Sequence, residues 1–429
     1  MGRKGWIVTF AGMGLNLALG ILYAWSVFGK QLTEAVDKGG FGWSKTQATL
    51  PYTIAIACFA AMMVPAGRLQ DKFGPRVIAS LGALLTGAGL IIASLGSPAT
   101  ILPAVLGFGV MAGTGIGLGY ASAMPAAIKW FPPQKKGLIT GLVVAGFGLA
   151  PVYIAPLSKY LLATYGISNS FMILGIAFML TTTIFAQFIK NPPLTDCSGK
   201  SGSGEQAATA RDNCSWRQMV RTPAFYSLYI QYACAATAGL MIIGHLAKIV
   251  SVQSGNTVKI GFLCVALLAV FNAGGRIVAG IVSDYIGRII TIALVCIVQA
   301  VIMSFFTQFS TANAFILGSA LVGFNYGACL ALFPATTADY WGTKNLGLNY
   351  GILFTAWGVG GVFGPMLAGK IADATGTYTA AYYIAAGLLL FAAFLAMLSY
   401  INISVDVVEK EITIKLVKKP AEKYQKSAA

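Results

Sequence analysis

The chain has 429 residues, of which 57% are hydrophobic and 10% charged, and its mean hydropathy is +0.75. Soluble globular domains carry about 25% charged residues, so this composition excludes an ordinary soluble enzyme and predicts a membrane protein. A formal net charge of +16 would indicate a nucleic-acid-binding protein if the chain were soluble. Here the positive residues stand mostly between apolar segments, and we expect no nucleic-acid partner.

Apolar segments of spanning length follow one another along the chain, and lipid forces such segments to be helices because it offers backbone groups no partner. The first is interpreted as a membrane span and not a signal peptide, since its apolar run is long and no small-residue cleavage site follows it. The predicted spans are 6–28, 47–66, 76–95, 100–126, 138–162, 168–189, 224–250, 258–282, 288–308, 312–335, 347–371 and 379–401.

These twelve spans form two sets of six, separated by a segment that contains the flexible sequence "DCSGKSGSGEQ". The predicted parts are therefore a helical bundle at 1–190, a linker at 191–222, a second bundle at 223–401 and a basic tail at 402–429. Most of the 29 lysine and arginine residues fall on the side that also holds both termini, which predicts that both termini are cytoplasmic. The tail either contacts anionic lipid headgroups or only sets this topology.

Two pairs of loop sequences repeat between the halves. "GRLQDKFGPRVI" (67–78) matches "GIVSDYIGRIIT" (280–291), and "KWFPPQKKGLITG" (129–141) matches "DYWGTKNLGLNYG" (339–351), at nearly the same offset. Because six spans separate the copies, the halves have the same orientation and form a parallel repeat. An aspartate near a helix N-terminus can make a breakable contact with the helix dipole. We predict a gate at Asp71, Arg76, Asp284 and Arg288; the alternative is that these loops are simple positive anchors.

Arg276 lies inside the predicted eighth span, in "FNAGGRIVAGIVSDYIGR" (271–288), whereas the thirteen acidic residues fall in loops, span ends or the tail. An arginine at the centre of a membrane costs at least about 2.5–3.5 kcal/mol, so it should face a cavity. A guanidinium without a carboxylate at its depth awaits an external anion, which it can bind through two parallel hydrogen bonds. The alternative is that Arg276 extends to the membrane surface.

Several polar side chains could accompany Arg276. Asn272 is one helical turn earlier on the same face, where it could orient the guanidinium, bind a substrate hydroxyl or join helices. His245, the single histidine, could carry a proton or be a packing residue. Tyr120 and Tyr326 occupy like places in the two halves, which favours cavity lining over the interfacial aromatic belt.

No sequence pattern indicates catalysis. The seven cysteines contain no CxxC pair, and no nucleophile stands with a base, so we expect neither an enzyme nor a cofactor or metal site.

The loop sequence "GRLQDKFGPR", with its echo in the second half, resembles the major facilitator superfamily along the whole chain. That resemblance implies its fold, an all-α membrane protein of twelve helices in two six-helix bundles, and alternating access by rocking of the halves.

"WFPPQKKGLITG", "ALFPATTADYWG" and "NAGGRIVAGIVSDYIGR" together resemble the bacterial oxalate/formate antiporter family, and "DKGGFGW" (37–43) resembles a motif of the monocarboxylate transporters. The resemblance implies that Arg276 is a substrate-binding arginine and that Trp357 stands where the oxalate carrier has a second cation, a lysine. One cation suits a monocarboxylate, because a dicarboxylate would keep one charge uncompensated. The aromatic cage of that family maps onto Tyr23, Tyr120, Tyr326 and Phe354, with Leu330 replacing a tyrosine.

Mammalian monocarboxylate transporters also have an aspartate and a lysine where this chain has Asn272 and Val27, which leaves the coupling mode open. We expect a monomeric secondary transporter in the bacterial inner membrane, in contact with lipids, that carries lactate, pyruvate or a similar monocarboxylate with protons. One alternative is anion exchange of the oxalate/formate type. The other is a sensor that binds the anion without moving it; this interpretation predicts an added signalling domain, for which 402–429 is too short.

Overall fold

The computed structural model of the chain describes residues 2–193, 213–255, 257–258 and 260–401. In these residues the regular structure is helical, apart from one isolated β-bridge between Ser97 and Thr100. The predicted basic tail and residues 194–212 of the predicted linker lie outside this part. The later end of that linker segment contains a short helix, α9 (Trp216–Met219).

The helices of the first half begin and end close to the predicted spans, and two of them include tighter or wider turns. The chain from Gly2 to Thr33 changes locally to a 3₁₀-helix, and the fourth span begins with a π-helical stretch. The elements are α1 (Gly2–Leu19), η1 (Gly20–Ala24), α2 (Trp25–Thr33), η2 (Val36–Lys38), α3 (Lys45–Phe73), α4 (Pro75–Ala93), α5 (Leu102–Ala104), η3 (Val105–Ala112), α6 (Gly113–Ile128), η4 (Pro133–Lys135) and α7 (Lys136–Phe188).

The second half repeats this order after α9. The seventh predicted span is interrupted at Gly244 and His245, which separate α10 from α11. The elements are α10 (Pro223–Ile243), α11 (Leu246–Gln253), α12 (Gly261–Ile286), α13 (Arg288–Phe306), α14 (Ala312–Trp341), α15 (Leu346–Thr375) and a last helix, Thr379–Ile401.

Eleven helices of the described chain are long and apolar enough to cross a membrane. One of them, α7, has 53 residues and would be roughly 80 Å long if it were straight, far more than a bilayer core of about 30 Å. It is broken at Gly166, whose φ of 73° and ψ of −177° lie outside the helical region. Counted as two arms, α7 supplies the fifth and sixth spans, and the twelve predicted spans are all present.

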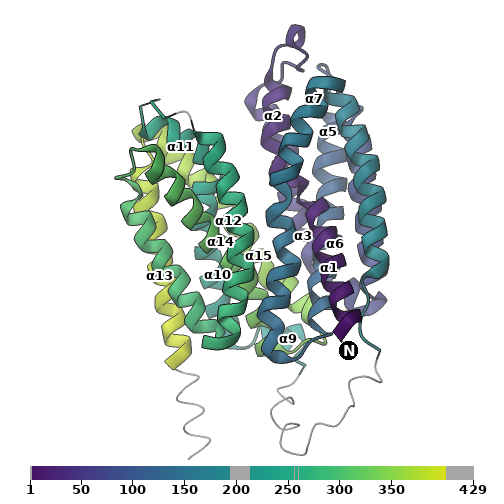
Figure 1. Cartoon of the computed structure of the whole chain (residues 1–429), viewed down its shortest axis with the longest axis vertical. Helices are drawn as coiled ribbons and strands as arrows, with labels where there is room; N and C mark the ends of the chain where they lie inside the picture. Colours follow the sequence, from purple (N-terminus) through teal and green to yellow (C-terminus); the bar gives the residue numbers. More distant parts are fainter. Residues whose placement is uncertain (1, 194–212, 256, 259, 402–429) are drawn as a thin grey trace, which may run out of the picture.

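The two halves stand side by side, the first in purple to blue and the second in green to yellow (Figure 1). They contact each other mainly through two helix pairs, α3 with α15 and α7 with α12, and less extensively through α7 with α14 and α6 with α15. The chain starts at the lower end of Figure 1, where α9 also lies. We call this the basic end, because it holds Arg3, Lys4, Arg68, Lys72, Arg76, Lys129, Lys135, Lys136, Arg217, Arg221, Arg288 and Lys344. The other is the opposite end.

The helix pairs approach most closely near the basic end, at glycines of the two sequence repeats. A Cβ atom on Gly67 would lie 2.1 Å from the carbonyl oxygen of Gly347, and one on Gly137 would lie 2.1 Å from that of Gly280. A side chain at any of these positions would push the two backbones apart. The same device occurs at corresponding places of both halves, as expected for a parallel repeat.

Adjacent glycines of α12 provide a direct test of this packing. A Cβ atom on Gly275 would lie 2.0 Å from the carbonyl oxygen of Phe324 on α14, whereas one on Gly274 would meet nothing within 4 Å. We expect Gly275→Ala to destabilise the folded protein by about 1–3 kcal/mol through overpacking and to lower its melting temperature in detergent. The matched control is Gly274→Ala, which should melt at or above the wild-type temperature; equal losses in both variants would contradict this.

Candidate functional site

The side chain of Arg276 is fully buried in the middle of α12. Its Nε atom donates a hydrogen bond to Oδ1 of Asn272 over 2.9 Å, and Nη1 donates to the carbonyl oxygen of Val144 on α7. The third nitrogen, Nη2, is buried without a hydrogen-bond partner. A buried donor without a partner is costly, more so on a charged group, so this guanidinium has one free direction for an acceptor.

One face of α7 packs against the guanidinium group of Arg276. Val144 and Gly148 are four residues apart and therefore lie on the same side of the helix. A Cβ atom on Gly148 would come within 3.2 Å of Nε of Arg276 and 3.3 Å of Oδ1 of Asn272, so any larger residue would press on this pair. Phe147 lies in the same turn of α7, and its ring contacts a group of aromatic side chains.

These rings form an aromatic cluster at the centre of the molecule, with members from both halves. Phe59 lies 5.5 Å from Tyr120 and 5.4 Å from Phe354 between ring centroids. Tyr120 is also 5.4 Å from Phe147. The cluster consists of Phe59 on α3, Tyr120 on α6, Phe147 on α7, Tyr326 on α14, and Phe354 and Trp357 on α15.

Trp357 has a defined place in the cluster. Its ring stacks on Phe354 with 4.9 Å between centroids, and its Nε1 atom donates a hydrogen bond of 2.7 Å to the Tyr326 hydroxyl group. The indole N–H is thereby satisfied, and the position carries no charge. The backbone of Asn272 packs against the residue that follows Tyr326, because a Cβ atom on Gly327 would be only 1.9 Å from the Asn272 carbonyl oxygen.

The structure thus brings Arg276, Asn272, Tyr120, Tyr326, Phe354 and Trp357 to one region between the halves. Tyr23 lies in η1, and its side chain is outside the described part of the structure. His245 lies elsewhere, between α10 and α11 at the opposite end. Its Nε2 atom is 2.9 Å from the carbonyl oxygen of Pro365, to which it must donate, and its Nδ1 atom is 3.5 Å from the Tyr378 hydroxyl.

At the basic end, Asp284 of α12 joins the halves by capping α7. Its Oδ1 and Oδ2 atoms accept hydrogen bonds of 2.9 Å from the backbone N–H groups of Gly137 and Leu138. These are first-turn donors of α7 that have no partner within the helix, and the carboxylate also complements the helix dipole. Arg288 contacts Oδ1 of Asp284 at 2.6 Å. We call these contacts the second clamp, because Asp284 belongs to the second half; the corresponding contacts of Asp71 in the first half are the first clamp.

A fourth helix, α14, strengthens the second clamp, which already joins α7, α12 and Arg288 of α13. Asp339, near the end of α14, accepts a hydrogen bond of 2.8 Å from Nε of Arg288 and one of 2.9 Å from Nζ of Lys136. The result is a chain of alternating charges from α7 through α14 and α13 to α12. Such a network holds its members in place better than one exposed ion pair.

The first clamp is built on the same plan with fewer charges. Asp71 of α3 accepts a hydrogen bond of 3.1 Å from the backbone N–H group of Leu348 in the first turn of α15. It also accepts a hydrogen bond of 2.6 Å from Nε2 of Gln70, and its charged partner, Lys129, lies at a longer distance of 3.9 Å. Burial lowers the pKa of the Lys129 ammonium group, and attraction to Asp71 offsets only part of this shift. This pair is therefore the weaker electrostatic contact.

Arg76 does not enter the first clamp in the way Arg288 enters the second. Gly74 and Gly287 have nearly the same backbone conformation, with φ of 87° and 95° and ψ of 154° and 152°. The residue after Gly287 is Arg288, whereas the residue after Gly74 is Pro75, and this shift leaves Arg76 exposed. The structural equivalent of Arg288 is thus a proline.

Sequence reasoning missed several residues of both regions. Phe59 and Phe147 could not be told from lipid-facing aromatics by their apolar surroundings. Their places in the internal repeat were nevertheless a usable signal, because Phe59 corresponds to Asn272 at the same offset that relates Asp71 to Asp284. Three further clamp residues, Lys129, Lys136 and Asp339, lie in the second pair of repeated loops. From the sequence alone they look like ordinary loop charges.

Comparison with known proteins agrees with this architecture. The family model of the Major Facilitator Superfamily matches residues 5–313 and 298–423, which together cover most of the chain. The fold and the match define a multi-pass membrane transporter. The chain belongs to the Major Facilitator Superfamily, and the predicted fold class is confirmed.

Similar curated sequences span nearly the whole chain. The uncharacterised transporter YhjX of Escherichia coli is 28% identical over 84% of this chain and 86% of its own length. The oxalate:formate antiporter of Oxalobacter formigenes is 28% identical over 89% and 88%. Monocarboxylate transporter 13 of Bos taurus is 22% identical over 91% and 88%.

Solved structures show the same fold at low sequence identity. The human organic anion transporter MFSD10 superposes with a TM-score of 0.70 at 14% identity, over 92% of this chain and all of that one. The fucose:proton symporter FucP of E. coli has a TM-score of 0.64 at 15% identity, over 90% and 98%.

The second clamp predicts a local change in amide exchange. We expect Asp284→Asn to speed hydrogen exchange at Gly137 and Leu138 by at least about tenfold, because hydrogen bonds to a charged group contribute about 1.5–3 kcal/mol. Mass spectrometry of the peptide covering 133–141 would measure this. Asp37→Asn, at an exposed aspartate of the opposite end, is the control, and unchanged exchange in Asp284→Asn would sink the capping role.

Proposed function

We propose that this transporter carries small monocarboxylate anions, such as L-lactate or pyruvate, together with protons, and that Arg276 binds the carboxylate. The observation that carries the proposal is the Nη2 atom of Arg276, which is buried without a hydrogen-bond partner. A planar guanidinium binds a carboxylate through paired N–H donors. The salt bridges of the described residues all lie among the clamp residues, so an anion from outside would supply the missing charge.

The neighbours of Arg276 favour a small monovalent cargo. Trp357 occupies the place at which the resemblance to the oxalate carrier implies a lysine, and its indole N–H is used by Tyr326. A second carboxylate would therefore meet aromatic rings and no second cation, which is unfavourable in a site of low dielectric constant. The Asn272 amide and the tyrosine hydroxyl groups could bind a hydroxyl or keto group of the cargo.

The two clamps suggest how the protein changes conformation during transport. With both termini in the cytoplasm, as the charge distribution predicts, the basic end faces the cytoplasm and its clamps close that side. Rocking of the halves would break the contacts of Asp71 and Asp284 with the helix N-termini and open the site inward. These carboxylate contacts are stable enough to hold one state and weak enough to be broken during transport.

A second candidate is exchange of one anion for another. It is favoured by the oxalate:formate antiporter among the relatives, which is more similar to this chain than monocarboxylate transporter 13 is. In proteoliposomes, L-lactate uptake that follows an inward proton gradient would identify symport. Uptake that ignores the gradient and requires an internal anion would identify exchange.

The role of Arg276 can be tested by keeping its charge and changing its shape. We expect Arg276→Lys to reduce L-lactate uptake by at least about tenfold, because an ammonium group cannot form the two parallel hydrogen bonds of a guanidinium. The assay is initial uptake of labelled L-lactate by proteoliposomes. Arg221→Lys, at an exposed arginine of the basic end, is the matched control. Normal uptake by Arg276→Lys would refute the assigned role.

Cargo valence should depend on Trp357. We expect Trp357→Lys to make oxalate a stronger competitor of L-lactate uptake, by about tenfold or more, since the added cation compensates the second carboxylate. Trp357→Phe removes the indole N–H but adds no charge, and it should leave oxalate a weak competitor. Strong oxalate inhibition of the wild-type protein would contradict the assignment to monocarboxylates.

A further inference from the structure

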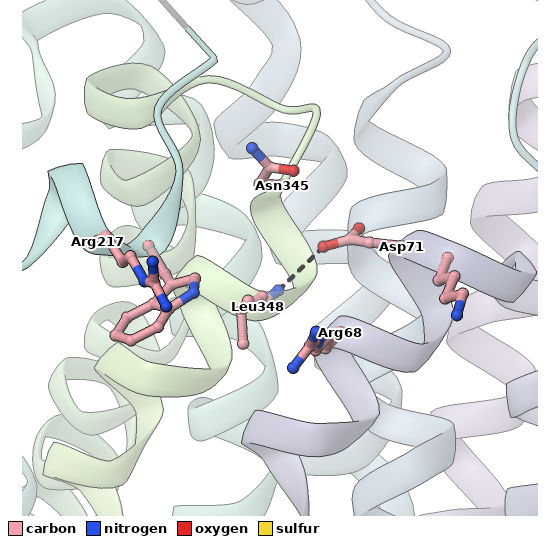
Figure 2. A pocket seen from close by; sticks show the side chains of 7 residues that line it. Arg68, Asp71, Arg217, Asn345 and Leu348 are labelled. Atoms are coloured by element: carbon pink, nitrogen blue, oxygen red, sulfur yellow. Dashed lines mark hydrogen bonds between the residues drawn. The ribbon is translucent and has the colours of Figure 1, made fainter.

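A second, separate region has the composition of a ligand site. At the basic end, a pocket of about 490 Å³ is open to the surface and lies beside the first clamp (Figure 2). Its lining comes from three elements, α3, α9 and the start of α15. The lining residues are Arg68, Asp71, Lys72, Trp216, Arg217, Asn345 and Leu348.

The pocket has an excess of positive charge. Its lining contains the cations Arg68, Lys72 and Arg217 and a single carboxylate, that of Asp71. This carboxylate is already engaged by the Leu348 backbone and by Lys129. No salt bridge of the described residues includes one of the three cations. In Figure 2 the Arg68 and Arg217 side chains flank the opening, on either side of Leu348.

The fold itself does not require these cations. In the internal repeat, Arg68 and Lys72 correspond to Ile281 and Tyr285 beside the second clamp. The second clamp forms with these uncharged neighbours, and Tyr285 is 85% exposed there. The positive lining is thus a property of the first clamp alone, which a repeated structural contact cannot explain.

The pocket is also assembled from both halves. Arg68 and Lys72 belong to α3 of the first half, Trp216 and Arg217 to α9 of the linker, and Leu348 to α15 of the second half. The hydrogen bond from Leu348 to Asp71 crosses between the halves within the pocket. A ligand that contacts both walls binds the closed basic end and loses one wall when that end opens, so it must favour the closed state.

We propose that this pocket binds a phosphate-bearing anion that holds the basic end closed and thereby slows transport. Arginine guanidinium groups bind phosphate oxygens through paired hydrogen bonds, and lysine adds a compact charge. Three cations match an anion of two or more charges better than the monovalent cargo. The volume is within the usual range for small-molecule sites. A soluble phosphate compound and a phospholipid headgroup share this chemistry.

The soluble source is tested with inorganic pyrophosphate and the full-length protein in detergent. We expect pyrophosphate to raise the melting temperature and to slow amide exchange in the peptide covering 345–350, where Leu348 donates to Asp71. In Arg68→Ala and in Arg217→Ala the pyrophosphate concentration needed for half of the effect should rise by about tenfold or more, since each loses a charged hydrogen bond.

The control is Arg221→Ala, which removes an exposed cation of the same end outside the pocket and should respond like the wild type. An equal loss of response in Arg221→Ala would mean nonspecific attraction and would overturn the site.

The lipid source is tested in nanodiscs of phosphatidylglycerol or phosphatidylcholine without added pyrophosphate. Slower exchange at 345–350 in phosphatidylglycerol, lost in Arg68→Ala and Arg217→Ala, would assign the site to a lipid headgroup. A protein that responds neither to pyrophosphate nor to phosphatidylglycerol would refute the proposal. Because no cargo is present in these measurements, they stand or fall independently of the substrate assigned to Arg276.

Discussion

The arrangement of the two halves depends on a carboxylate of one half placed at the N-terminus of a helix of the other. Asp284 accepts hydrogen bonds from two first-turn amides of α7, and Asp71 accepts one from α15. These contacts require the helix backbones to touch, which the glycines at the crossing points allow. The same closeness of α7 and α12 lets Arg276 reach the Val144 carbonyl. The polar site at the centre is therefore a product of the contacts at the basic end.

The halves share a plan but not their chemistry at the centre. At the two crossings, a Cβ atom on Gly141 would lie 2.2 Å from the Arg276 carbonyl, and one on Gly351 would lie 2.3 Å from the Met63 carbonyl. Met63 is thus the counterpart of Arg276, just as Phe59 is the counterpart of Asn272. One half contributes the polar pair, and the other contributes apolar groups that shape its surroundings. A site of one charge results from two related halves.

Much of the fold could be predicted from sequence because the membrane restricts the choices. Spans of apolar residues must be helices, and the repeated loops indicate from the sequence alone that the two halves are related. The break of α7 at Gly166 fell between two predicted spans. The central site was predicted less fully. Arg276 was conspicuous as a charge, but Phe59 and Phe147 look like any lipid-facing aromatic residue.

Side-chain direction also limited what could be predicted. Arg76 and Arg288 match in the aligned loops, yet the gap in that alignment places Pro75 at the structural position of Arg288, and Arg76 points to the surface. His245 was conspicuous because it is the single histidine. Its hydrogen bond to Pro365 ties it to the opposite end instead. Residue type suggested a gating role for Arg76 and a site role for His245. The path of the helices places both side chains elsewhere.

The hydrogen bond from Arg276 to Val144 has a thermodynamic consequence. Donor and acceptor belong to different halves, so the guanidinium cannot keep this partner through a large relative movement of α7 and α12. The intrinsic affinity of Arg276 for an anion must then differ between conformations, since the number of its competing acceptors changes. Reciprocity requires that a bound anion shift the conformational equilibrium by the same free energy. A single carbonyl oxygen thereby links occupancy of the site to the orientation of the halves.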